Sequence, residues 1–170
     1  MDSIQQYSRR DCLEISGIPI LPLDSPANLT LEMGQLIGVT IDKQDISIAH
    51  RLPDTKGKKD RFIVKFVRRE KRDKFYKSRK HLGGKKASVL PVVACEMGKS
   101  IHQDSAMYIN ESLTQYHSEL FRRVNKFKKE NKDKFLWTNN CKIYLCKHET
   151  SQTFTFTTFE EFEDFIAPSQ

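Results

Sequence analysis

The order in which two hydrophobic patterns follow one another constrains the fold of this chain more than any other feature. In the first two thirds of the chain, some segments show the alternation of apolar residues that is typical of strands. Other segments show the spacing of apolar residues, or the composition, that is typical of helices. The predicted order is strand, helix, strand, strand, helix, strand, over residues 12–19, 25–38, 45–52, 61–67, 68–82 and 107–113. Ser25-Pro26 suits a helix start, and Gly83-Gly84 suits a helix stop.

This order is that of a split βαβ, ferredoxin-like sheet. Side chains along the third segment alternate, so it is predicted to be a half-buried strand with Ile46, Ile48, His50 and Leu52 on one face. Residues 85–105 match neither pattern and are predicted to form an irregular excursion. We therefore predict a first domain over residues 11–113.

A second predicted unit has the order helix, three strands, helix. The first helix is predicted for residues 114–131, and the strands for residues 134–138, 142–147 and 153–157. Asn139-Asn140 suits the turn between the first two strands, because Asn tolerates the left-handed conformation. Thr158 and Glu161 form a capping box that opens a short last helix. The predicted fold class is α+β, with a small α/β domain over residues 114–170.

Positive charge is concentrated in the middle of the chain. Residues 56–100 contain 16 Lys and Arg against 4 Asp and Glu, whereas residues 1–55 contain 4 against 8. The formal net charge of the whole chain is +7 at pH 7. Such a distribution attracts polyanions, and nucleic acid is the first candidate.

Two basic clusters bracket the first predicted sheet. One combines the turn before its third strand with the helix that follows, and the other lies on the helix over residues 114–131. Lys and Arg contact phosphates as point charges or bidentate forks, whereas the alternative for each cluster is a solvated helix face. We predict nucleic-acid contacts for Lys56, Lys58, Lys59, Arg61, Arg68, Arg72, Arg122, Arg123, Lys126, Lys129 and Lys142.

Base stacking is a separate question from phosphate contact. Typical RNA-recognition sheets stack bases on aromatic side chains of their first and third strands. Glu14 and Ile63 stand at the matching positions here, so we predict binding that depends on charge and tolerates different sequences. Trp137 and Tyr144 lie on a later hairpin among lysines, where they either stack a base or pack in the interior.

Enzymatic, metal and membrane functions find little support in the sequence. There is no nucleophile–histidine motif and no phosphate-cradling glycine loop, so we expect no catalysis and no cofactor. Cys141, Cys146 and His148 suggest zinc, but an odd spacing along a strand turns the two cysteines to opposite faces. No apolar stretch approaches the roughly 18 residues of a membrane span. The polar first residues are no export signal, so we expect an intracellular protein.

The residues also carry a family resemblance. Residues 7–19 (YSRRDCLEISGIP), 49–53 (AHRLP) and 61–66 (RFIVKF) resemble first-ORF proteins of LINE-type (non-LTR) retrotransposons. Later segments are similar to invertebrate members and to the C-terminal part of the baculovirus few-polyhedra protein; they are residues 108–114, 120–123, 135–139 and 142–145. The similarity covers about residues 7–167.

The resemblance implies a non-standard RNA-recognition motif followed by a small C-terminal domain, which together grip single-stranded RNA in a basic cleft. It implies that Arg122-Arg123 contact RNA and that Lys58, Lys59 and Arg61 form the basic turn before the third strand. Members coat their own transcript, act as nucleic-acid chaperones and trimerise through an upstream coiled coil. Residues 1–10 resemble the end of that coiled coil or a linker, so a trimer is expected only with the coiled coil present.

These observations together predict a sequence-tolerant, non-enzymatic binder of single-stranded RNA, with single-stranded DNA as a second ligand. We expect it in a cytoplasmic ribonucleoprotein, with the nucleus as a second compartment. The alternative is a protein-interaction or viral assembly module that binds no nucleic acid and whose basic face meets acidic proteins.

Overall fold

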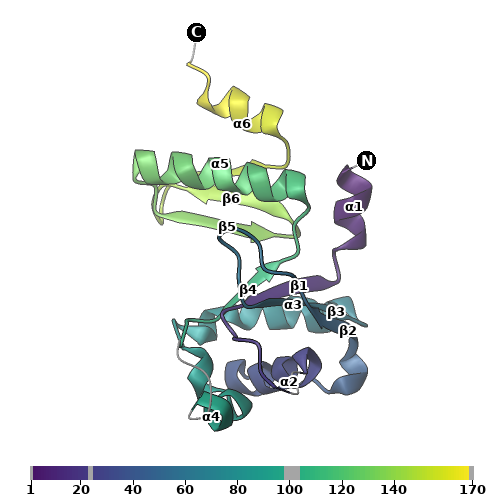
Figure 1. The fold of residues 1–170 in the computed structure, drawn as a ribbon. Helices are drawn as coiled ribbons and strands as arrows, with labels where there is room; N and C mark the ends of the chain where they lie inside the picture. Colours follow the sequence, from purple (N-terminus) through teal and green to yellow (C-terminus); the bar gives the residue numbers. More distant parts are fainter. Residues whose placement is uncertain (1, 23–24, 98–103, 169–170) are drawn as a thin grey trace. The chain divides into compact units, whose positions relative to one another are not determined.

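The computed structural model describes residues 2–22, 25–97 and 104–168, and they form an α+β structure with two antiparallel sheets and six α-helices (Figure 1). Contacts between Cα atoms divide the chain into two compact units. The first unit is Asp11–Ser112, and the second combines Met1–Arg10 with Leu113–Gln170. Among the described helices, none combines the length and the apolarity needed to cross a membrane.

The first unit contains a four-stranded sheet in the order β2-β3-β1-β4, with every neighbouring pair antiparallel. Its strands are β1 (Cys12–Ser16), β2 (Ile46–Arg51), β3 (Arg61–Phe66) and β4 (Tyr108–Glu111). Helix α2 (Pro26–Ile37) connects β1 to β2, and α3 (Arg69–Lys77) follows β3. Short 3-10 turns add η1 (Lys43–Asp45), η2 (Ser78–Leu82) and η3 (Ala87–Val89). The predicted order of strands and helices is therefore present.

One face of this sheet is packed against the helices. Leu13 lies opposite Val64 and Ile15 opposite Phe62 in the β1–β3 register, and all four side chains are fully buried. Alternation along the strands turns the intervening residues to the other face. The face without helices, called here the outer face of the first sheet, carries Glu14 and Ile63 as direct neighbours.

The alternation predicted for β2 is wrong. The pairing with β3 shifts between Ile46 and Ile48, so that Ile46 packs against the core while Ile48 is 54% exposed. An irregularity of this kind adds one residue to a strand and moves every later side chain to the opposite face. Ala49 takes the inward position instead.

The excursion predicted for residues 85–105 is partly ordered into helix. It contains η3 and α4 (Pro91–Met97), and Leu90 and Val93 are fully buried in the core of the first unit. Ser88 closes the segment by donating from its backbone N and its Oγ to the carboxylate of Asp104, at 3.1 and 2.5 Å. Residues 98–103 of the predicted excursion lie outside the described residues.

The second unit contains a three-stranded sheet in the order β5-β6-β7. Its strands are β5 (Phe135–Asn139), β6 (Lys142–Cys146) and β7 (Thr153–Phe156), and its helices are α1 (Asp2–Ser8), α5 (Gln115–Asn131) and α6 (Phe159–Ile166). Helix α5 lies across the sheet (Figure 1). The buried core contains Leu120, Val124, Ile143, Leu145, Phe156 and Phe162.

The β5–β6 hairpin turns one residue later than predicted. Asn139 pairs with Lys142, and the two turn residues Asn140 and Cys141 have φ angles of 51° and 63°. Cys141 therefore belongs to the turn, and the strand position inferred for it from the sequence is wrong. The Gln6 side chain of α1 donates to the Cys141 Sγ at 3.1 Å and accepts from the Thr114 backbone N at 2.9 Å. These bonds anchor α1 to the β5–β6 turn and to the start of α5.

The start of α6 carries a capping arrangement close to the predicted one. Thr158 Oγ1 accepts from the Glu161 backbone N at 3.1 Å, while the Glu161 carboxylate accepts from the backbone N and the hydroxyl of Thr157. The hydrogen bond from the Thr157 backbone, above all, lowers the pKa of Glu161 below its ordinary value of 4.5. A lowered folded-state pKa means stability that is present at neutral pH and lost on acidification.

We expect Glu161→Gln to lower the free energy of unfolding of the second unit by about 0.5–1 kcal/mol at neutral pH, because the cap and the helix dipole both favour a carboxylate there. The difference from the unchanged protein should vanish as the pH falls through the folded-state pKa of Glu161. Urea denaturation followed by Trp137 fluorescence at neutral and acidic pH measures this. Glu160→Gln is the matched control, and an equal effect at both positions would contradict the assigned cap.

Candidate nucleic-acid interface

The basic turn between β2 and β3 is tight and exposed. Thr55 and Lys58 exchange two backbone hydrogen bonds of 2.9 Å, and Gly57 takes the left-handed conformation that closes the turn, with a φ of 81°. Lys56, Lys58 and Lys59 are all exposed. Within the described ranges none of these three ammonium groups has an ion-pair partner. Three cations that offset no carboxylate are available to an external anion.

Arg61 begins β3 at the same end of the sheet. Its guanidinium donates to the Glu14 carboxylate at 3.2 Å and to the Pro53 carbonyl at 3.3 Å, and its side chain is 14% exposed. Arg61 pairs with Ser16, and Ser16 pairs with Tyr108, so the three residues form one row across the outer face of the first sheet. The bonds to Glu14 and Pro53 hold the guanidinium at the base of the basic turn.

Tyr108 is a residue that sequence reasoning missed. It is 59% exposed on β4, in the row just described. Met107 and Ile109 are buried on either side of it, and this alternation was readable in the sequence. The exposed ring stands two strands away from β3 on the outer face of the first sheet, and an exposed ring of this kind offers a face for stacking.

Arg68 lies at the other end of β3. It is exposed, and its Nη2 lies 3.4 Å from the carboxylate of Asp45. The six residues of β3 separate it from the basic turn, which corresponds to roughly 20 Å of strand. The structure therefore does not bring Arg68 together with Lys56, Lys58 and Lys59.

The prediction that Arg72 contacts nucleic acid is wrong. Its side chain is 2% exposed, and its Nη2 donates to the fully buried carboxylate of Glu111 at 2.6 Å. Burial lowers the pKa of Arg72, but the hydrogen bond and the charge of Glu111 outweigh that effect and leave the pKa raised. The guanidinium stays charged and points into the first unit, away from any phosphate.

One face of α5 in the second unit carries exposed cations. Arg122, Lys126 and Lys129 recur at i, i+4 and i+7, as predicted, and all three are exposed. Arg122 forms a two-pronged ion pair with Glu119 at 2.9 and 2.6 Å, and this hydrogen bonding lowers the pKa of Glu119. Lys126 lies 3.9 Å from Glu130. Such exposed pairs are weak, so a phosphate can replace the carboxylates.

Arg123 and Lys142 lie away from that face. The Arg123 guanidinium stands over the ring of Phe159, 5.2 Å from its centre, and 3.5 Å from Glu163 of α6. Arg122 and Arg123 thus form ion pairs with different elements. Lys142 begins β6 and is exposed.

Trp137 and Tyr144 are stacked on each other across the β5–β6 pair. Their ring centres are 5.4 Å apart with 10° between the planes, and both side chains are half-buried. They alternate with the core residues Leu136, Ile143 and Leu145, so they occupy the sheet face away from that core. The two predicted alternatives for these rings, stacking on a base and packing in the interior, both stay predictions.

The eleven predicted residues thus fall into separate groups within their own units. The first unit presents the basic turn with Arg61 and, at the other end of β3, Arg68; the second presents the α5 face. The cleft expected between the units stays a prediction. Among the described residues, no three His, Cys, Asp or Glu side chains gather as a metal site. Cys146 instead donates from its Sγ to the His148 carbonyl at 3.0 Å.

Comparison with known proteins bears on the second unit. Residues 114–165 match the family described as Baculovirus FP protein domain 2. The match begins at Thr114, whose hydroxyl caps α5, and ends within α6. No curated protein matches the chain. The predicted similarity to the baculovirus few-polyhedra protein is therefore confirmed for residues 114–165.

Proposed function

We propose that this protein binds single-stranded RNA with little sequence preference, without catalysis, as a coat and chaperone in a retrotransposon-type ribonucleoprotein. The observation that carries the proposal is the basic turn, where Lys56, Lys58 and Lys59 are exposed and offset no carboxylate among the described residues. Unpaired cations on an exposed turn destabilise a fold through mutual repulsion, and a polyanion removes that cost.

The architecture of the first unit supports the proposal. Its strand order β2-β3-β1-β4, with α2 and α3 at the two crossovers, is the connectivity of a split βαβ sheet. We infer a non-standard RNA-recognition motif, in which Glu14 and Ile63 replace the stacking rings at the centre of the outer face. Affinity then depends on phosphate contacts, which explains why little sequence preference is expected.

Single-stranded DNA is proposed as a second ligand, because both kinds of strand carry the same phosphate charge. The proposed setting is intracellular, in the cytoplasm or the nucleus. Self-association into a trimer is proposed only for a chain that carries an upstream coiled coil.

A second candidate function is protein interaction or viral assembly without nucleic acid. The match of residues 114–165 to a baculovirus protein domain favours it. The exposed acids Glu160, Glu163 and Asp164 on α6 give it a surface of opposite charge to the α5 face. RNA footprints that lengthen with the oligonucleotide support RNA binding, whereas their absence favours protein interaction.

We expect the triple variant Lys56→Ala/Lys58→Ala/Lys59→Ala to weaken binding to all single-stranded RNA sequences alike. The loss of three phosphate contacts should reduce the slope of log K against log salt by about two units. The double variant Arg122→Ala/Arg123→Ala should reduce the same slope by about one to two units. Filter-binding titrations of single- and double-stranded RNA at several salt concentrations measure both slopes.

The matched control for the basic turn is Lys74→Ala/Lys77→Ala/Lys80→Ala. These three lysines are exposed on α3 and η2 of the same unit, and their replacement changes the net charge equally. Its slope should stay within about half a unit of that of the unchanged protein. Equal losses in both triple variants would show that net charge alone attracts RNA and would remove the basic turn from the interface.

A further inference from the structure

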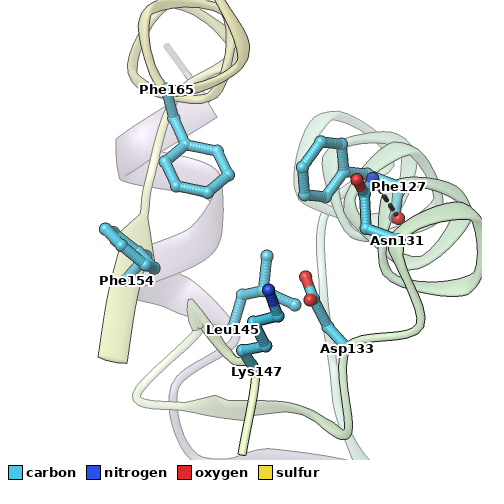
Figure 2. A pocket seen from close by; sticks show the side chains of 7 residues that line it. All are labelled: Phe127, Asn131, Asp133, Leu145, Lys147, Phe154 and Phe165. Carbon is cyan, nitrogen blue, oxygen red and sulfur yellow. Dashed lines mark hydrogen bonds between the residues drawn. The ribbon is translucent and has the colours of Figure 1, made fainter. Parts of the chain in front are cut away.

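A pocket opens in the second unit between the end of α5, the end of β6, β7 and α6 (Figure 2). Its volume is about 210 Å³. A cavity of about 150 Å³ binds benzene, and drug-sized ligands need roughly 300 Å³ or more. The space therefore suits one planar ring system, such as a single nucleobase.

The walls of the pocket are aromatic. Phe127, Phe154 and Phe165 line it, and the ring of Phe165 lies 5.5 Å from that of Phe127 and 4.6 Å from that of Phe154. Figure 2 shows the three rings around the open space, with the side chain of Leu145 below them. Phenyl rings of this kind contact the faces and edges of a planar base.

Two opposite charges stand at the pocket without ion-pair partners. Figure 2 shows the Asp133 carboxylate and the Lys147 ammonium group turned toward the space among the rings. Within residues 2–22, 25–97 and 104–168, neither side chain forms a hydrogen bond or an ion pair. The third polar residue, Asn131, already donates from its Nδ2 to the Phe127 carbonyl at 2.9 Å.

The position of Asp133 works against the stability of α5. Lys132 ends the helix in the left-handed conformation, with a φ of 57°, and the Asp133 backbone N then donates to the Lys128 carbonyl at 3.0 Å. This fixes a carboxylate beside the negative end of the helix dipole, where an acid is unfavourable. A ligand that donates hydrogen bonds to Asp133 offsets that cost.

We propose that this pocket binds one guanine base of a single-stranded RNA, an inference that rests on the proposed function. The Watson–Crick edge of guanine presents two adjacent donors, N1–H and N2–H, beside the acceptor O6. The Asp133 carboxylate accepts from both donors, Lys147 donates to O6, and the phenyl rings contact the base. Reading an unstacked base by its edge while apolar rings hold its faces is an established mode of recognition.

Other bases satisfy this charge pair less well. Adenine, cytosine and uracil each lack two adjacent donors for the carboxylate. The surroundings suit the phosphates on either side of the base, because Lys128, Lys129 and Lys132 belong to the same helix end. A single pocket of this kind adds a modest preference for guanine to binding that is otherwise set by charge.

The test compares RNA decamers that differ at one position. The intact chain is titrated with a uridine decamer and with decamers carrying one central guanosine, inosine or adenosine. Guanosine should bind about tenfold tighter than adenosine or uridine, and inosine, which lacks N2–H, should fall between them. Asp133→Asn should remove the guanosine preference. Asp164→Asn, which changes the charge equally on exposed α6, should keep it, and Trp137 fluorescence confirms that both variants fold.

The possible outcomes separate this proposal from the function it rests on. Salt-dependent decamer binding with no guanosine preference overturns the guanine pocket and leaves RNA binding intact. Titration with guanosine monophosphate that shifts the amide resonances of Asn131, Asp133 and Lys147, while no decamer binds, overturns both RNA binding and this proposal, and assigns the pocket to a free nucleotide. A phenylalanine-containing peptide that binds where guanosine monophosphate does not overturns the proposal and assigns the pocket to a protein partner.

Discussion

Replacing Glu111 with alanine is expected to lower the free energy of unfolding of the first unit by about 3–5 kcal/mol, because it leaves a buried guanidinium without its main partner. The Glu111 side chain is fully buried, and Arg72 opposite it is 2% exposed. The Arg72 Nε is already buried without a hydrogen-bond partner in the described structure. Amide hydrogen exchange along β3 measures the opening free energy of this unit, while Trp137 fluorescence follows the second unit.

Two further variants make this prediction specific to a buried pair. Asp73→Ala removes the other carboxylate on Arg72, which lies 3.1 Å from Nη1 and is half exposed; the expected loss is no more than about 1 kcal/mol. The double variant Arg72→Met/Glu111→Leu replaces the pair with apolar side chains and should be close to neutral. A large loss in Asp73→Ala, or none in Glu111→Ala, would contradict the assigned role of the pair.

The double variant also separates stability from function. Arg72 lies among exposed cations of α3, yet the structure gives it no route to a phosphate. RNA affinity in Arg72→Met/Glu111→Leu should therefore match that of the unchanged protein. The sequence contained the signal for this, because Arg72 precedes Phe75 and Tyr76 by three and four residues and so shares their buried helix face.

Glu111 was readable in the same way. It follows Met107 and Ile109 at the alternation of a strand, which places a carboxylate on the inward face. A lone acid on an inward strand face and a lone arginine on an inward helix face predict one buried pair. The summed charge of α3 does not distinguish Arg72, which faces inward, from the exposed cations of the same helix.

The hydrophobic pattern of the sequence could not predict features that depend on how the backbones of neighbouring strands pair. The periodicity predicted α5 and β3 closely, because long amphipathic helices and buried strands have strong hydrophobic patterns. The shift in β2 between Ile46 and Ile48 left no mark in composition, so the predicted inward face was wrong there. The pocket in the second unit escaped prediction for a related reason. Its phenylalanines look like core residues in the sequence, and only the end of α5 brings Asp133 to them.

We expect Gly17→Ala to lower the free energy of unfolding of the first unit by about 3 kcal/mol or more. Gly17 has a φ of 91°, which costs a residue with a Cβ about 1–2 kcal/mol. A Cβ there would also stand 2.0 Å from the Ala106 carbonyl oxygen, so the backbone before β4 must move. Overpacking of this kind adds about 1–3 kcal/mol.

Gly38→Ala is the matched control, because Gly38 has a similar φ of 78° with no atom within 4 Å of the added Cβ. It should cost only the backbone strain of about 1–2 kcal/mol, and the difference between the two variants measures the clash with Ala106. The clash also bears on the proposed RNA interface, because the Gly17 backbone N donates to the Asp60 carbonyl at 3.0 Å, directly before Arg61. RNA affinity should therefore fall in Gly17→Ala and stay unchanged in Gly38→Ala, and equal stability losses in the two variants would show that β4 yields without strain.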